Sequence, residues 1–146
     1  MKLIKYFIQF IIVIILFLIF KLIGYERASN FGSKIGSVFG KFLRSEKIII
    51  KNLDIIIKNS NLKVENKNML VNDVYSNYGR ILSEYMYIDK FRKGSLNNYV
   101  NIKGMNHIEE IKSKNKKVVF ISGHFNNFEL MALFIEASGV NLAAIY

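Results

Sequence analysis

An almost unbroken apolar block near the N-terminus of the 146-residue chain constrains its fold more than any other feature. Gln9 is the only polar residue in Tyr6–Phe20, and with its lysine-bearing flanks the block reaches about the 20 residues of a membrane-crossing helix. A cleaved signal peptide is the alternative, but Tyr25-Glu26-Arg27 stands where a small-residue cleavage site would lie. We therefore expect an uncleaved membrane anchor helix over residues 1–24 and one further domain over residues 25–146. Positive charges on both sides of the block leave its orientation open.

Charge and cysteine content narrow the possible partners. The chain carries 21 lysine and arginine residues against 11 acidic ones, a net charge of +10, which attracts anionic partners by long-range Coulomb forces. The basic residues form no arginine-rich tract and no zinc-finger spacing, and they accompany a membrane segment. We therefore expect a lipid or an acidic carrier protein as partner rather than nucleic acid. The absence of cysteine excludes disulfides and thiolate metal sites within the chain.

Helical periodicity follows the anchor. Gly32, Gly36 and Gly40 recur every four residues, which aligns small residues on one face of a helix over Ala28–Phe42. This stripe predicts close packing against another helix or contact with the bilayer. A flexible loop is the alternative, since glycine is costly inside a helix, but the apolar residues of the segment also recur at helical spacing. The same spacing predicts further helices over Ser45–Lys58 and Lys67–Lys90, and a short helix is expected over residues 106–113.

The C-terminal third has the pattern of a strand, a tight loop and a helix. The run from Val118 to Ile121 has the composition of a buried strand. A helix is predicted over Phe128–Ala137, with Asn126 or Asn127 as its N-cap and Gly139 as its C-terminal stop. Further strands are predicted over Tyr99–Ile102 and from Val140 to Tyr146. The expected fold class is therefore α/β: a membrane helix followed by helices and a partial mixed sheet.

His124 lies in the predicted loop between strand and helix, where α/β folds commonly bind ligands. Histidine titrates near neutral pH, so it can take a proton from an alcohol and return it to a leaving thiol, as transacylation requires. Glu129 would lie on the first helical turn and could bond one imidazole nitrogen. The structural alternative is that His124 caps the helix and Glu129 favours its positive N-terminus. A metal site is not expected, because His107 is the only other histidine and cysteine is absent.

The residues around His124 also carry a family resemblance. Residues 122–130, Ser-Gly-His-Phe-Asn-Asn-Phe-Glu-Leu, resemble the signature of the bacterial lipid A biosynthesis acyltransferases, the lauroyl/myristoyl transferase family. The core of that signature is histidine, four residues, then aspartate or glutamate. Asn126 and Phe128 stand where it often has glycine and tryptophan.

Two upstream segments extend the resemblance over nearly the whole chain. Arg44 with Asn52-Leu53 resembles the Arg…Asn-Leu helix of the family, although the Phe-Pro that usually follows is missing. Asn77-Tyr78-Gly79-Arg80, followed by Glu84, resembles its Asn-x-Gly-Arg…Glu segment. The motifs occur in the family's order and at similar intervals.

The resemblance implies a glycerolipid acyltransferase-like fold and transfer of a fatty acyl group to a hydroxyl of a lipid A precursor, in lipopolysaccharide biosynthesis. The donor would be acyl carrier protein or another acyl thioester, with no cofactor. The reaction would take place at the bacterial inner membrane, with the catalytic part facing the cytoplasm. His124 would be the general base and Glu129 its orienting partner. Arg80, Asn126 and Asn127 are the candidate substrate-binding residues.

Three alternatives stay open at this point. Arg80 could hold a phosphate or support the site, or form a structural ion pair with Glu84 one helical turn later. The acceptor could be another membrane glycolipid or a glycerolipid. Family members are longer than this chain, so we expect residues 25–146 to be the N-terminal part of an acyltransferase domain, and an inactive membrane-tethered fragment is the third alternative.

Overall fold

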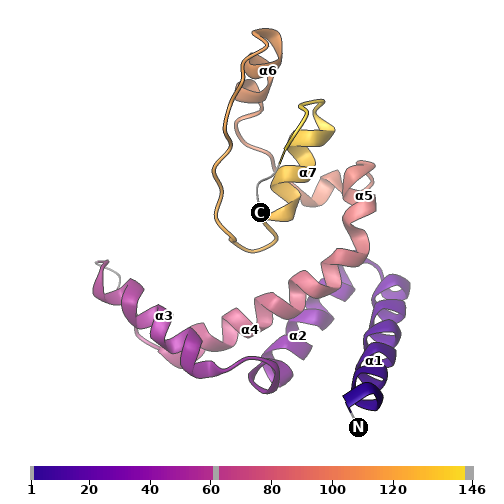
Figure 1. Cartoon of the computed structure of the whole chain (residues 1–146), viewed down its shortest axis with the longest axis vertical. Coiled ribbons are helices and arrows are strands. Elements are labelled where there is room, and N and C mark those ends of the chain that lie inside the picture. The colour runs from indigo at the N-terminus through magenta and orange to yellow at the C-terminus, as the bar shows by residue number, and fades with distance from the viewer. Residues whose placement is uncertain (1, 61–62, 144–146) are drawn as a thin grey trace. The chain divides into compact units, whose positions relative to one another are not determined.

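The computed structural model describes residues 2–60 and 63–143, and every regular element in these ranges is a helix (Figure 1). The predicted α/β fold with a partial mixed sheet is therefore wrong for the part of the chain that the structure describes. The chain divides into two compact units, residues 1–86 and 87–146. The first unit contains α1 (Lys2–Ile23), α2 (Tyr25–Leu43), α3 (Glu46–Lys58) and α4 (Lys67–Glu84), and the second contains α5 (Ile88–Arg92), α6 (Met105–Ser113) and α7 (Glu129–Ala137).

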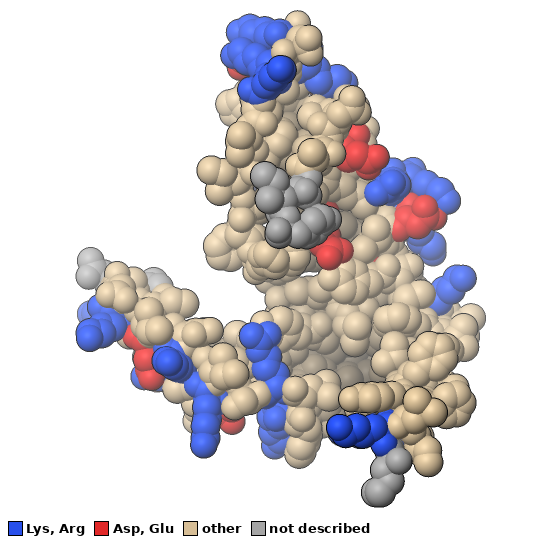
Figure 2. Space-filling view, in the orientation of Figure 1, with Lys and Arg blue, Asp and Glu red and all other residues tan. Residues whose placement is uncertain are grey.

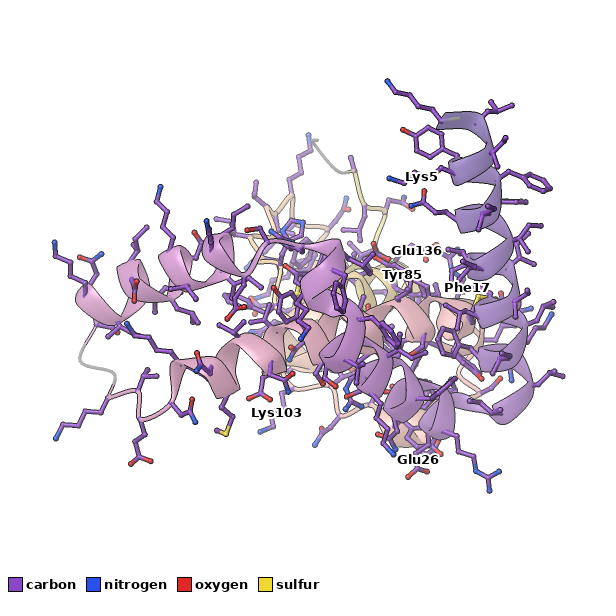
Figure 3. The ribbon with its side chains drawn as sticks, turned by 90° about the horizontal axis from the view of Figure 1, so that it is seen from below. Lys5, Phe17, Glu26, Tyr85, Lys103 and Glu136 are labelled. Carbon is purple, nitrogen blue, oxygen red and sulfur yellow. The ribbon has the colours of Figure 1, made fainter. Side chains whose placement is uncertain are left out.

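The apolar block forms α1, which is long and apolar enough to cross a membrane by length and composition. Within α1, all of which the structure describes, Phe20 is the one buried residue, and its ring meets Phe31 of α2 edge-on at a centroid distance of 6.1 Å. Gly24, with a positive φ of 83°, separates α1 from α2. Figure 3 shows Lys5 near the free end of α1 and Glu26 at the turn into α2. Most apolar side chains of α1 point outward, which suits a helix surrounded by lipid.

The glycine stripe of α2 is its contact surface for α4, and the two helices lie side by side in Figure 1. A Cβ added to Gly36 would lie 2.9 Å from the backbone nitrogen of Gly79, and one added to Gly40 would lie 2.6 Å from the ring of Tyr75. Real side-chain carbons do not approach other atoms this closely, so a larger residue would force the helices apart. The predicted helix and its close packing against another helix are both confirmed.

A small apolar cluster joins α3 to α4. Ile49 of α3 packs with Val71 and Tyr75 of α4, and partly buried side chains surround them. The side-chain oxygen of Asn66 caps α4 by accepting a hydrogen bond from the backbone N–H of Met69 at 3.1 Å. The opposite side of α3 is basic, and its lysine side chains stand out at the lower left of Figure 2.

The helix predicted over Lys67–Lys90 is interrupted. α4 ends at Glu84, a 3-10 helix follows over Tyr85–Tyr87, and α5 resumes at Ile88. Near the end of α4 the hydroxyl of Ser83 donates to the backbone carbonyl of Arg80 at 2.7 Å. Such side-chain bonds compete with the regular ladder of a helix and favour its bending or termination.

The three predicted strands are wrong within the described residues. Residues 116–121 have no regular secondary structure, and Val119 and Ile121 are 87% and 93% exposed. A short 3-10 helix, Asn97–Tyr99, overlaps the second predicted strand, and residues 140–143 of the third are irregular, while 144–146 lie outside the described residues. A strand is stable through its hydrogen bonds to a neighbouring strand, and among the described segments no such neighbour exists.

In the second unit, α6 and α7 agree closely with the helices predicted over residues 106–113 and Phe128–Ala137. Lys112, in the last turn of α6, donates from Nζ to the backbone carbonyl of Ser138 at 2.6 Å, which ties α6 to the C-terminal end of α7. Gly139 follows with a φ of 85° and ends α7 in the left-handed conformation. The predicted glycine stop is confirmed.

Candidate active site

A tight turn presents His124 to solvent. The backbone N–H of Phe125 donates to the carbonyl of Gly123 at 2.9 Å, so His124 occupies the centre of a three-residue turn. Its side chain is exposed, and its ring lies against that of Phe128, with centroids 4.0 Å apart and planes at 49°. The imidazole is thus accessible to a substrate on one side and held by an aromatic ring on the other.

The two asparagines that follow His124 shape the entry into α7. Asn126 has a left-handed backbone with φ of 47°, a conformation that asparagine tolerates better than most residues. The carbonyl of Asn127 accepts a hydrogen bond from the N–H of Leu130 at 3.2 Å. The N-cap position belongs to Phe128, with no side-chain cap bond, so the prediction that Asn126 or Asn127 caps the helix is wrong.

Glu129 is the first residue of α7 and so lies on its first turn, as predicted. The positive end of the helix dipole favours a carboxylate at this position. It is half-buried and lines a hollow of about 310 Å³ together with Arg92 and Glu136, which form an ion pair at 3.6 Å. The described lining of this hollow comes from α5, α7 and Leu142 and does not include His124. The structure therefore places His124 and Glu129 at the same end of α7. The Glu129 side chain lines this hollow, and His124 does not.

The other side of α7 faces an apolar hollow of about 390 Å³. Leu130, Met131 and Phe134 of α7 form one wall of it, and residues 100–105 with Ile108 of α6 form the other. Its volume and apolar lining are within the range of small-molecule sites in proteins. Residues that immediately follow Glu129 thus line space suited to a hydrocarbon group.

Arg80 belongs to the first unit, where it takes part in a hydrogen-bond network between α2 and α4. Its Nη1 donates to the hydroxyl of Ser29 at 2.9 Å, and that hydroxyl donates to Oε1 of Glu84 at 2.7 Å. Arg80 also reaches Asn30 at 3.4 Å, and the Tyr25 hydroxyl reaches Glu84 at 3.4 Å. The expected link between Arg80 and Glu84 is thus relayed through Ser29. The sequence motifs did not identify Ser29, and the only signal for it was its position one turn before the glycine stripe.

Arg44, from the first upstream motif, is held at the end of α2. Its Nη1 donates to the Tyr78 hydroxyl at 2.7 Å, and its guanidinium lies 5.1 Å from the centroid of that ring. The Tyr75 hydroxyl donates to the backbone carbonyl of Arg44 at 2.9 Å. The first and second upstream motifs are therefore in contact, and together they fix the connection between α2 and α3.

Comparison with known protein families gives one match that spans the chain. The family model described as bacterial lipid A biosynthesis acyltransferase matches residues 1–146. No curated protein and no solved structure matches the chain significantly. The matched range includes the exposed His124, the N-terminus of α7 and the α2–α4 network.

Proposed function

Because the chain belongs to the bacterial lipid A biosynthesis acyltransferase family, we propose that it transfers a fatty acyl group from acyl carrier protein to a hydroxyl of a lipid A precursor. The family match along residues 1–146 is the observation that carries this proposal. Membership makes the protein an acyltransferase with a lipid acceptor. The donor, the hydroxyl that is acylated and the roles of individual side chains are the proposed part.

In the proposed reaction His124 acts as general base. One imidazole nitrogen takes the proton from the acceptor hydroxyl as the oxygen attacks the carbonyl carbon of the acyl thioester. The tetrahedral intermediate collapses when the carbon–sulfur bond breaks, and the imidazolium returns the proton to the leaving thiolate. The products are the acylated lipid and the free thiol of the carrier. These steps use the acyl thioester and the acceptor, and they require no separate cofactor.

Several features of the described residues support this assignment. His124 is exposed at a tight turn, where a lipid hydroxyl can reach it, and Phe128 limits the movement of its ring. The apolar hollow beside Leu130 and Phe134 offers space for an acyl chain close in sequence to the histidine. The net charge of +10 favours both a phosphorylated lipid and an acidic carrier protein.

The remaining roles are proposed from the motif. Glu129 orients the imidazole by accepting a hydrogen bond from its second nitrogen, as the carboxylate of a Ser-His-Asp triad does. Asn126 and Asn127 bind the substrate beside His124, where their amides can donate and accept hydrogen bonds. Arg80 binds a phosphate of the acceptor, since a guanidinium has more N–H donors than its bonds to Ser29 and Asn30 use.

We place the reaction at the bacterial inner membrane, with the catalytic part in the cytoplasm. The family is membrane-associated, and α1 supplies an apolar helix of sufficient length. Confining the enzyme to the surface that holds its lipid acceptor raises the effective concentration of one for the other without any new contact.

The decisive experiment compares His124→Ala with His107→Ala. His107, on α6, is the only other histidine and is exposed, so its replacement controls for the loss of an imidazole. Transfer of a labelled acyl group from acyl carrier protein to a lipid A precursor is measured in membranes that contain equal amounts of each variant.

We expect His124→Ala to lower the rate by about 100-fold or more, as loss of a general base does, and His107→Ala to leave it unchanged. Equal rates of transfer by His124→Ala and the parent would contradict the proposed role of His124. A parent rate no higher than that of membranes lacking the protein would favour an inactive membrane-tethered module. Activity toward a glycerolipid but not toward the lipid A precursor would favour the alternative acceptor.

A further inference from the structure

We propose that one face of α2 lies on the anionic phospholipid surface of the bilayer. This outer face is opposite the glycine stripe and consists of an apolar row, Phe31, Val38 and Phe42, and a basic row, Arg27, Lys34 and Lys41. The proposal adds a second membrane contact to that of α1, and it does not depend on acyl transfer.

The apolar row is exposed although its residues are large. Val38 and Phe42 are 56% and 76% exposed, while the glycines on the other side of the same helix are buried against α4. Residues spaced by seven and four positions share a face of a helix, so Phe31, Val38 and Phe42 form one continuous row. A row of this kind needs an apolar environment that α4 does not supply.

The basic row runs beside the apolar one. Arg27, Lys34 and Lys41 are each seven residues apart, so they too share a face, and all three are exposed. Nζ of Lys41 lies 5.4 Å from the centroid of the Phe42 ring, which shows how closely the rows adjoin. Phenylalanines next to lysines that can extend toward phosphates are typical of helices lying in a membrane interface.

Continuity with α1 favours a bilayer over an acidic protein as the occupant. Phe31, at one end of the apolar row, contacts Phe20 of the candidate membrane helix. The apolar surface of α1 therefore passes directly into that of α2, and Arg27 is close to the end of α1, where basic residues attract anionic headgroups. A docking site for an acidic protein would need the lysines but not the exposed phenylalanines that continue from α1.

The chain contains no cysteine, so a single cysteine gives a specific attachment point for an environment-sensitive fluorophore. We suggest Phe42→Cys on the outer face and, as control, Asp73→Cys, an exposed residue of α4 that does not belong to the outer face. The full chain is reconstituted in vesicles of phosphatidylcholine, with or without phosphatidylglycerol. Quenching by aqueous iodide and by quencher-bearing lipids is then measured for each labelled protein.

With phosphatidylglycerol present, we expect the probe at Phe42 to be several-fold less accessible to iodide than the probe at Asp73 and to be quenched by the lipids. Lys34→Glu/Lys41→Glu in the Phe42→Cys protein should restore iodide access, with helix content by circular dichroism unchanged because both lysines are exposed. Equal iodide access at the two positions in both kinds of vesicle would overturn the proposal. Protection that arises only after acyl carrier protein is added would also overturn it, in favour of a protein partner.

Discussion

Gly79 of α4 and Gly36 of α2 are in backbone contact, so close that a Cβ added to Gly79 would lie 2.8 Å from the Cα of Gly36. Gly79 belongs to the motif that also contains Arg80, and the contact places the Arg80 guanidinium within reach of Ser29. The glycine therefore has a structural role that makes the neighbouring polar network possible. Glycine at this position needs no special backbone angle, since the close approach alone excludes a side chain.

Gly79→Ala should destabilise the first unit by about 1–3 kcal/mol, because the added carbon meets backbone atoms that cannot move aside independently. Asn72→Ala, at an exposed position of the same helix, is the control and should change the stability little. Urea unfolding in mild detergent, followed by helical circular dichroism, measures the difference. Equal midpoints for the two variants would show that α2 and α4 are not packed as described.

Ser29→Ala should cost about 1.5–3 kcal/mol, because it removes a hydroxyl that joins two charged groups, Arg80 and Glu84, in a largely buried place. Ser33→Ala is the matched comparison. Ser33 shares a hydrogen bond of 2.6 Å with Ser76, both neutral, on the same pair of helices, so its loss should cost only about 0.5–1.5 kcal/mol. The same unfolding measurement ranks the two, and a larger loss for Ser33→Ala would argue against a charged network.

The stability of the first unit should fall at alkaline pH in a way that depends on Tyr75. Burial raises the pKa of the Tyr75 hydroxyl above its usual 10.0, the Glu46 carboxylate raises it further, and Arg44 opposes the rise. The folded chain therefore keeps this proton at a pH where the unfolded chain has lost it. The contribution to stability is complete below about pH 10 and is lost as pH rises through the folded pKa.

Tyr75→Phe tests this dependence because phenylalanine cannot ionise. We expect the difference in unfolding free energy between the parent and Tyr75→Phe to shrink as pH is raised above about 10. Tyr99→Phe, at an exposed tyrosine, should show no such change. A constant difference between the parent and Tyr75→Phe across this pH range would be evidence against the raised pKa.

Phe128→Ala should lower kcat more than it raises KM, since Phe128 touches the imidazole of His124 and does not itself react. Loss of the ring frees the histidine to leave its working orientation, and misplacement of a catalytic group by about 1 Å can cost about 100-fold in rate. Phe128→Trp should retain activity because it restores an aromatic ring at this position. Steady-state kinetics of acyl transfer distinguish the cases, and full activity of Phe128→Ala would remove Phe128 from the site.

The helices could be predicted because their signals are local. Apolar residues at helical spacing identified α2 and α3, and Gly139 marked the end of α7. The glycine stripe indicated close packing but not its partner, because the meeting of Gly36 with Gly79 depends on two segments far apart in sequence. The break after Glu84 was missed, since the hydroxyl of Ser83 acts on a backbone carbonyl that no periodicity reveals.

The strands could not be predicted reliably for a related reason. Val118–Ile121 has the composition of a strand, but a strand also needs a neighbouring strand to pair with, which its own composition cannot reveal. Among the described residues there is no such neighbour. The motif placed Glu129 correctly at the start of α7, and whether it bonds His124 stays a prediction. Arg80 was identified as a candidate from its motif, while its link to Glu84 through Ser29 required the approach of two helices.

The Arg80–Ser29–Glu84 network has a consequence for the electric field around the protein. The positive charge of Arg80 and the negative charge of Glu84, both bonded to the Ser29 hydroxyl, cancel one another. The net charge of +10 therefore comes from the other ionisable side chains, among which every lysine is exposed. Attraction of this origin extends about one Debye length, roughly 8–10 Å at ordinary ionic strength, and weakens as salt is added. Attraction of anionic partners therefore depends on the ionic composition of the surrounding solution. The buried hydrogen bond between Ser29 and Glu84 is screened by salt much less.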